Sequence, residues 1–329
     1  MKAKIPFYLF IVLIFLLAAC AVPAPATETA TEPAAEPAAE PATPTKAFTA
    51  TEVPSTATAA SPSRPLSNLG ADPQRKEFQA DDGKNLVGYY YPSKYADAPI
   101  MILMHWAGGD LTDWCEIAPW LQNRRDENPA ALERCANAGS GLPAGMSTPW
   151  LDSTWFPSMA PEVSFAVFAF DFRDYGESEK GLGSSSDWAK DAKAAFVTAA
   201  GLEGVDATRM ASMGASIGAD GAPDGCVLYN QEAGSGCVGA FSLSPGNYLG
   251  MDFAAVVRDL ASTPVWCLAG ELDSGSAPVC DGAGGERYRS VVYPGIDLHG
   301  MRLITPDLEP QPLILTQDFL ELVFGEIVK

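Results

Sequence analysis

Hydrophobic and polar residues follow one another along the chain in a pattern that predicts strands and helices. The runs 99–104 and 163–170 are apolar without interruption, as is typical of strands buried on both faces of a sheet. Further strands are predicted at 77–80, 86–91, 209–213, 238–243, 265–269 and 288–293. Amphipathic segments predict helices at 252–260, at 313–328 and between a cap at Ser186 or Asp187 and a stop at Gly201. Strands alternating with helices at this spacing imply an α/β domain, with a mostly parallel sheet covered by helices on both faces.

The N-terminal residues have the pattern of a secretory signal peptide. Lys2 and Lys4 precede an apolar run at 5–17, which is shorter than the ~20 residues needed to cross a membrane. The small residues that end in Cys20 resemble the bacterial lipoprotein box, in which the cysteine is lipidated and becomes the mature N-terminus. The prediction is a signal peptide at 1–19 and an extracytoplasmic protein, anchored to the bacterial cell membrane through lipid on Cys20. Ordinary cleavage and a retained anchor are the alternatives.

Residues 20–68 are rich in Pro, Ala, Thr and Glu and contain almost no large apolar side chains. Such a segment cannot bury enough surface to offset its ordering entropy, so it predicts a disordered, extended tether. The remaining residues, 69–329, have the length and the apolar content expected of one large α/β domain.

Charge and cysteine content limit the partners and the compartment. The formal net charge is −20 and no basic cluster is present, so nucleic-acid binding has no electrostatic basis. Six of the seven cysteines remain once Cys20 is set aside, and an even number in an exported chain indicates disulfides. Among the possible pairings we expect the sequence-local set of Cys115–Cys135, Cys226–Cys237 and Cys267–Cys280. A zinc site is disfavoured because the chain has two histidines and no Cys-x-x-Cys, and no metal or cofactor is expected.

The candidate chemistry begins at Gly214-Ala-Ser-Ile-Gly218, a Gly-x-Ser-x-Gly pentapeptide that follows a predicted strand. This pattern is typical of a tight strand-to-helix turn that exposes a serine hydroxyl, here that of Ser216. A serine nucleophile needs a general base, and the two histidines are His105 and His299. Asp273 is the candidate acid because it follows a predicted strand and lies between Ser216 and His299 in the chain.

Five landmarks occur in the order seen in the α/β-hydrolase superfamily, and the chain resembles its dienelactone-hydrolase-like and small-esterase branches most closely. The landmarks are 105–109, 171–178, Ser216, 270–273 and 299–300. The resemblance implies an α/β-hydrolase fold with Ser216 as nucleophile, Asp273 as acid and His299 as base. It also implies an oxyanion hole formed by the backbone N–H groups of Ile217 and Ala107.

Other residues near these landmarks have expected structural roles. His105 would stabilise the oxyanion turn rather than act as a base, and Glu271 is the alternative acid. Arg173 and Asp174 would organise a loop by ion pairing. The segment 220–225 is rich in Gly and Pro, which predicts a turn-rich interruption of the helix after the serine.

The connection 110–162 is long for a link between two core strands, and it contains several aromatic residues. Long ordered connections tend to form lids or binding walls, so we expect this insertion to border the active site. Trp155 and Trp106 are the candidate pocket residues, and the indole of Trp106 stands where the family pattern has glycine. The connection 244–264 is too short for a large cap domain.

These observations predict an extracytoplasmic serine hydrolase that cleaves a small-molecule carboxylic ester or a related acyl compound through an acyl-enzyme. The alternative is a non-catalytic lipoprotein of the same fold that binds a ligand or a partner through its tryptophan-rich insertion. Peptidase, lipase, dienelactone hydrolase and acyltransferase activities are all compatible with the sequence, which does not define an oligomeric state.

Overall fold

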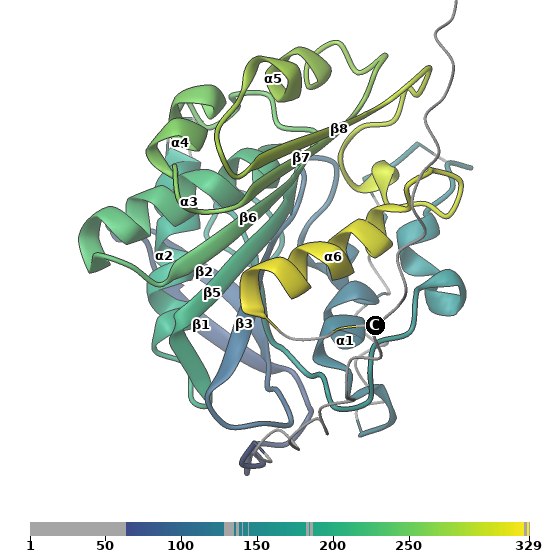
Figure 1. Ribbon diagram of the computed structural model, residues 1–329. Helices are drawn as coiled ribbons and strands as arrows, with labels where there is room; N and C mark the ends of the chain where they lie inside the picture. Colours follow the sequence, from purple (N-terminus) through teal and green to yellow (C-terminus); the bar gives the residue numbers. More distant parts are fainter. Residues whose placement is uncertain are drawn as a thin grey trace, which may run out of the picture. The chain divides into compact units, whose positions relative to one another are not determined.

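Eight strands form one mostly parallel sheet in the computed structural model of this protein, which describes residues 64–127, 135, 138–139, 141–143, 145–181, 184, 187–325 and 328 (Figure 1). Their order across the sheet is β1-β2-β4-β3-β5-β6-β7-β8, and β2 runs antiparallel to both of its neighbours. The strands are β1 (Gln74–Gln79), β2 (Asn85–Tyr91), β3 (Ala98–Met104), β4 (Ala166–Asp171), β5 (Val205–Ala215), β6 (Cys237–Leu243), β7 (Val265–Gly270) and β8 (Tyr288–Tyr293). The predicted signal peptide, Cys20 and most of the tether lie outside the described residues.

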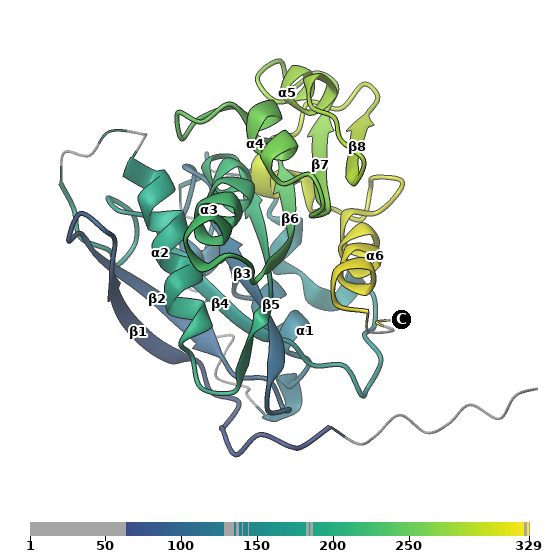
Figure 2. The same cartoon turned by 60° about the vertical axis from the view of Figure 1, so that its left-hand side comes forward.

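Helices cover both faces of the sheet, as the alternation of elements predicts. They are α1 (Ile117–Gln122), α2 (Trp188–Ala200), α3 (Ile217–Ala233), α4 (Phe253–Asp259), α5 (Ala277–Gly282) and α6 (Pro312–Phe324). Residues of α1 and α6 pack on one face, whereas α2, α3, α4 and α5 pack on the other (Figures 1 and 2). Within the described ranges, none of these helices has both the length and the apolar character to cross a membrane.

The strand β3 shows why some apolar runs are unbroken. Met101 and Leu103 point into the core on the α1 and α6 side, whereas Ile100, Ile102 and Met104 point into the core beneath α2 and α3. All five side chains are fully buried. A strand with helices on both faces must be apolar at every position, which is the pattern that the sequence has.

The predicted strands and helices are present, and they differ from the structure mainly at their ends. The strand β5 begins at Val205, four residues earlier than predicted. The helix α6 was predicted to reach residue 328 but ends at Phe324, because Gly325 takes a left-handed conformation with φ +69° and caps the helix. The short helix α5 was not predicted.

The predicted interruption at 220–225 is wrong, because α3 runs through this segment without a break. Pro223 lacks the N–H that would bond the carbonyl of Ala219, but the Ser242 hydroxyl donates to that carbonyl instead, at 2.7 Å. Gly225 lies against α2, and a Cβ built there would meet the Ala192 backbone at 3.0 Å. Contacts with the rest of the fold therefore stabilise α3 at a proline and a glycine, two residue types that disfavour an isolated helix.

Three disulfides are present, and they are the sequence-local pairs. Cys115–Cys135 and Cys226–Cys237 each have a Cα–Cα distance of 5.4 Å, and Cys267–Cys280 has one of 5.7 Å. Each bridge closes a short stretch of chain within the domain.

The loop after β4 is organised by Arg173 but not by an ion pair with Asp174. The buried guanidinium of Arg173 donates to Asp82 at 2.7 Å and to Asp191 at 2.6 Å. Asp174 instead adopts φ +73° and accepts a hydrogen bond from the backbone N–H of Gly181. The prediction of ion pairing is right for Arg173 and wrong for Asp174, for which no ion pair is found among the described residues.

Candidate active site

Ser216 lies on the sharp turn between β5 and α3. Its backbone has φ 53° and ψ −113°, a conformation that residues with side chains rarely adopt. The glycines on either side of it leave space for this turn. A Cβ built on Gly214 would lie 1.9 Å from the Gly218 carbonyl oxygen, and one built on Gly218 would lie 2.2 Å from the Met104 carbonyl oxygen. The pentapeptide thus has the steric requirements of a nucleophile elbow.

The structure brings Ser216, His299 and Asp273 together in one chain of hydrogen bonds. The Ser216 Oγ lies 2.8 Å from His299 Nε2, and His299 Nδ1 lies 2.7 Å from an Asp273 carboxylate oxygen. The three residues follow the carboxyl ends of β5, β8 and β7, which meet at the same edge of the parallel sheet. The alternative acid, Glu271, instead accepts a hydrogen bond from the backbone N–H of Gly295.

The contact with Asp273 defines the protonation of the histidine ring. An ionised carboxylate accepts hydrogen bonds only, so His299 Nδ1 carries the proton and Nε2 is free to accept one from Ser216. Burial would raise the pKa of Asp273, but the hydrogen bond and the electrostatic attraction from His299 oppose that rise. Together with the hydroxyl groups of Ser276 and Ser244, they outweigh burial and hold the pKa below its ordinary value. The acid is therefore ionised at neutral pH, as the orienting role requires.

Two backbone N–H groups beside Ser216 are available to bind an oxyanion. Ile217 is the first residue of α3, and Ala107 follows β3 in the adjacent turn. In the part of the chain that the structure describes, neither N–H reaches a backbone acceptor. Gly218 packs against the carbonyl groups of Met104 and His105, so the turn after β3 and the start of α3 are in direct contact.

His105 fixes the peptide that carries the Ala107 N–H. Its Nδ1 lies 2.8 Å from the Trp106 carbonyl oxygen, which also accepts a bond from Gly109 N, and its Nε2 accepts one from Phe172 N. Because the peptide is planar, holding the Trp106 carbonyl also directs the N–H of Ala107. Burial lowers the pKa of His105 to about 4, so the ring is neutral. The structure places this histidine in the oxyanion turn and not beside Ser216.

The two candidate pocket tryptophans occupy different places. The indole of Trp106 borders the site, because a Cβ built on Gly300 would meet its ring at 2.8 Å and Ser216 Cβ at 3.7 Å. Trp155 instead donates to the Pro149 carbonyl and packs against Phe156, with ring centroids 5.0 Å apart. Neither of these partners belongs to the triad or to the oxyanion turn. Another insertion residue, Trp150, is buried and packs against Trp106, with ring centroids 5.9 Å apart.

Residues after β6 also contribute to the site, and the sequence did not identify them. Ser244 accepts a hydrogen bond from Gly300 N at 3.0 Å, and the Tyr248 ring lies edge-on to His299 with centroids 6.3 Å apart. The connection 244–264 contains α4 and no cap domain. The position of Ser244 directly after a central parallel strand was the signal that could have found it.

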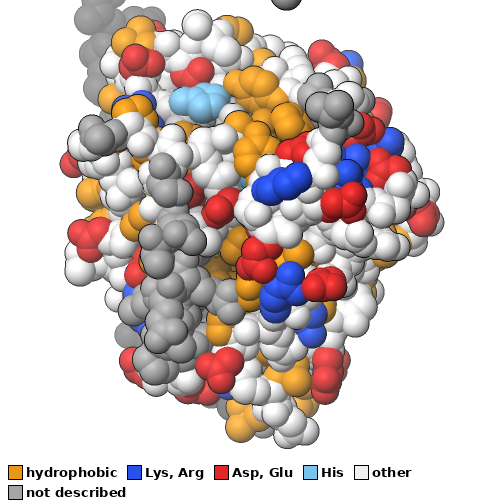
Figure 3. All heavy atoms as spheres, turned by 180° about the vertical axis from the view of Figure 1, so that it is seen from behind, with side chains coloured by type: hydrophobic (Ala, Val, Ile, Leu, Met, Phe, Trp, Pro, Cys, Tyr) orange, Lys and Arg blue, Asp and Glu red, His pale blue; other side chains and the backbone are white. Residues whose placement is uncertain are grey.

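The site opens to solvent at the histidine. His105 is fully buried, so the histidine surface visible in Figure 3 belongs to His299, whose side chain is 35% exposed. Hydrophobic side chains lie near this histidine on the same face (Figure 3). No group of three or more metal-binding side chains is found among the described residues.

Comparisons with known proteins relate the fold to solved structures. No protein-family model matches the chain, and no curated protein matches it. An esterase from Pyrococcus furiosus matches with a TM-score of 0.50 and 16% identity, over 80% of this chain and 100% of the esterase. A protein of unknown function from Agrobacterium tumefaciens, described as an α/β hydrolase, matches with a TM-score of 0.51 and 19% identity, over 78% and 99%. The α/β hydrolase GrgF from a Penicillium species matches with a TM-score of 0.52 and 12% identity, over 77% and 99%. The chain has the α/β-hydrolase fold.

Proposed function

We propose that this protein is a serine hydrolase that cleaves carboxylic esters or related acyl compounds. The observation that carries the proposal is the continuous hydrogen-bond chain from Asp273 through His299 to Ser216 at the elbow. Nucleophile, base and orienting acid are the three groups that acyl transfer by serine requires. The fold shared with an esterase is consistent with this chemistry.

In the proposed mechanism, Ser216 Oγ attacks the substrate carbonyl carbon while its proton passes to His299 Nε2. Asp273 stabilises the imidazolium that forms, and the N–H groups of Ile217 and Ala107 bind the oxyanion of the tetrahedral intermediate. The carbon–oxygen bond to the leaving alcohol then breaks, and His299 returns the proton to that alcohol. Water attacks the acyl-enzyme by the same sequence in reverse, which releases the acid and restores Ser216.

A labelling experiment tests the nucleophile. A fluorophosphonate probe should label the wild-type protein at Ser216, and Ser216→Ala should lose both the label and roughly 10⁶-fold in kcat on p-nitrophenyl esters. Ser93→Ala is the matched control, because Ser93 is also a buried serine. Its hydroxyl donates to the Ser164 carbonyl and not to a member of the proposed triad. Full activity in Ser216→Ala would refute the proposal. Ligand binding without turnover of any ester would favour the non-catalytic alternative.

A panel of p-nitrophenyl esters of increasing acyl length addresses the substrate class. The buried indole of Trp106 next to Ser216 restricts the space beside the nucleophile. We therefore expect short acyl chains to be preferred. Equal or higher kcat/KM on long chains would contradict this expectation and point to a lipase.

We also propose that the protein acts outside the cytoplasm, held to the membrane by lipid on Cys20. The three disulfides are compatible with an oxidising compartment, and Cys20 follows a signal-peptide pattern. Incorporation of an alkyne fatty acid into the protein expressed in bacteria tests the anchor. Cys20→Ser should lose the label and leave the membrane fraction, and a labelled Cys20→Ser protein would refute lipidation at this residue.

A further inference from the structure

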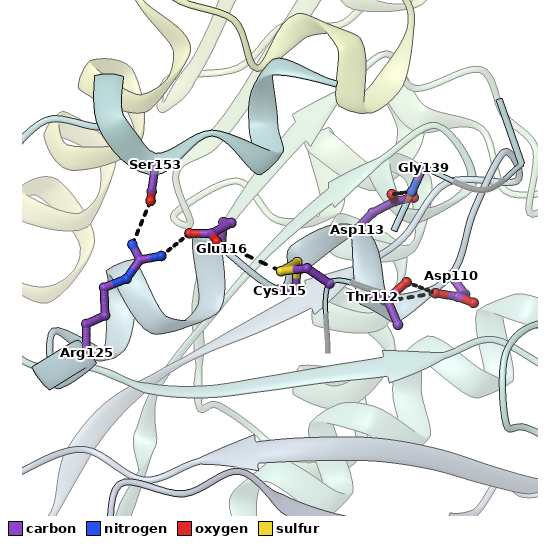
Figure 4. Close-up of a disulfide and its surroundings, with 9 residues drawn as sticks. Asp110, Thr112, Asp113, Cys115, Glu116, Arg125, Gly139 and Ser153 are labelled. Atoms are coloured by element: carbon purple, nitrogen blue, oxygen red, sulfur yellow. Dashed lines mark hydrogen bonds and ion pairs between the residues drawn. A yellow bond between two sulfur atoms is a disulfide. The ribbon is translucent and has the colours of Figure 1, made fainter. Parts of the chain in front are cut away.

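Asp113 is a fully buried carboxylate next to the oxyanion turn, and the proposed mechanism assigns it no role. One of its oxygens accepts a hydrogen bond from the indole Nε1 of Trp106 at 2.7 Å, and the other accepts one from Gly139 N at 2.8 Å. Figure 4 shows Asp113 directed at Gly139 of the insertion, close to the Cys115 disulfide. We propose that Asp113 is a positioning residue for the oxyanion hole and acts through Trp106. This inference rests on the proposed function.

The connection between Asp113 and the oxyanion donor passes through a single residue. Trp106 supplies the carbonyl group of the peptide whose N–H belongs to Ala107, and His105 and Gly109 hold that carbonyl. Asp113 holds the side chain of the same residue. With both its side chain and its carbonyl fixed, Trp106 cannot rotate, and the N–H of Ala107 keeps its direction. A charge-assisted hydrogen bond in a dry environment is strong enough to impose such a constraint.

A second part of the insertion also packs directly on this turn. A Cβ built on Gly141 would lie 2.1 Å from the Gly108 carbonyl oxygen, so the two backbones are in contact. A Cβ built on Gly109 would lie 1.9 Å from an Asp113 carboxylate oxygen. The Cys115–Cys135 disulfide joins the helical turn that carries Asp113 to the segment that leads to Gly139. Asp113 therefore lies where the insertion, the disulfide and the oxyanion turn meet.

A carboxylate suits this position because it accepts hydrogen bonds at both oxygens. Asparagine has the same shape but only one accepting oxygen, so it cannot satisfy the indole N–H and the Gly139 N–H together. Burial raises the pKa of Asp113, and the bonds from Trp106 and Gly139 oppose that rise. Each of the two donors is thus matched to one oxygen of the buried acid.

A double-mutant cycle on the full chain separates a positioning role from general structural support. Asp113→Asn should lower kcat on p-nitrophenyl acetate by about 10- to 100-fold, less than the roughly 10²–10³-fold caused by removing an oxyanion donor outright. KM should change little, because the oxyanion forms only after binding. Trp106→Phe keeps an aromatic ring without its donor and should lower kcat similarly. In Trp106→Phe, a further Asp113→Asn change should have little additional effect.

Asp191→Asn is the matched control, because Asp191 is an equally buried carboxylate that binds Arg173 instead. It should reduce stability and leave kcat unchanged. If the wild-type enzyme is active but Asp113→Asn leaves kcat unchanged, this inference is overturned and the proposed function is not. The same holds if the two substitutions act additively. If Asp113→Asn does not fold, an unchanged kcat in Trp106→Phe overturns it. A wild-type protein with neither turnover nor a label on Ser216 would overturn the proposed function and this inference with it.

Discussion

Asp220 lies one turn beyond the proposed nucleophile and links its helix to the loop that follows β6. Its buried carboxylate accepts hydrogen bonds from Gly246 N and Tyr248 N. The same loop provides Ser244, whose hydroxyl accepts from Gly300 N beside the proposed base. Burial raises the pKa of Asp220 to about 7, despite the backbone N–H groups that favour its ionised form.

This shift in pKa predicts a measurable dependence of stability on pH. Between the ordinary value of 3.8 and about 7, the folded protein holds a proton on Asp220 that the unfolded chain has released. Stability contributed by this group is therefore complete at low pH and declines as the pH rises to about 7. Relative to Asp220→Asn, the wild-type free energy of unfolding should fall by up to about 1.4 kcal/mol per pH unit in this window and then level off.

Urea unfolding of both proteins at a series of pH values measures this difference directly. The comparison with Asp220→Asn cancels the contributions of buried acids that do not interact with Asp220, such as Asp171, which both proteins contain. Parallel stability curves for the two proteins between about pH 4 and pH 7 would show that Asp220 is ionised throughout that range.

At the scale of elements, the helix α3 shows where local sequence is a poor guide. Gly221, Pro223 and Gly225 are unfavourable in an isolated helix, and the segment 220–225 was predicted to break for that reason. The strand β6 supplies the missing donor through Ser242, and glycines allow α3 to approach its neighbours closely. These partners are distant in the chain or depend on the folded arrangement, so propensity alone could not reveal them.

The substitution of Pro223 offers a test of this compensation. Ser242→Ala leaves the buried Ala219 carbonyl without its donor and should destabilise the protein by about 1–3 kcal/mol. In a Pro223→Ala background the new backbone N–H can bond that carbonyl, so the same Ser242→Ala change should have a smaller effect. Urea unfolding of the four proteins measures the difference.

Ser212→Ala is the control for this cycle. The Ser212 hydroxyl donates to the Ala222 carbonyl of the same helix at 3.0 Å, but the backbone donor four residues later is Cys226 and is intact. Its effect should therefore be the same with Pro223 or Ala at position 223. If Ser242→Ala is equally damaging in both backgrounds, the Ser242 hydroxyl does not replace the missing N–H.

At the scale of the whole molecule, the sequence was most informative about residues that directly follow a strand. Ser216, Asp273 and His299 each follow a predicted strand, and parallel strands bring such residues to one edge of the sheet. Contacts within the insertion 110–162 were not predictable in this way. Trp155 was expected in the pocket, but it is Trp150 that lies beside Trp106, because side-chain packing decides which aromatic residue of the insertion contacts Trp106.

The three disulfides lie at different positions relative to the proposed active site. Cys115–Cys135 lies within the insertion and joins residue 135 to the helical turn that carries Asp113. Cys267–Cys280 links β7 to α5 and encloses the loop that carries Asp273. Cys226–Cys237 links the middle of α3 to the first residue of β6 and encloses no residue of the proposed triad. The second of these bridges encloses the acid of the proposed triad, and the first adjoins Asp113, the proposed positioning residue.

Removing the bridges one at a time should therefore separate stability from activity. The loops span 20, 11 and 13 residues, so each paired Cys→Ala variant should lose about 3 kcal/mol of unfolding free energy. Cys267→Ala with Cys280→Ala should also lower kcat by about 10-fold, because Asp273 is then held less precisely against His299. Cys226→Ala with Cys237→Ala is the matched control and should retain its kcat at a temperature where it is folded. An equal loss of kcat in the control would mean that the bridges support activity only through global stability.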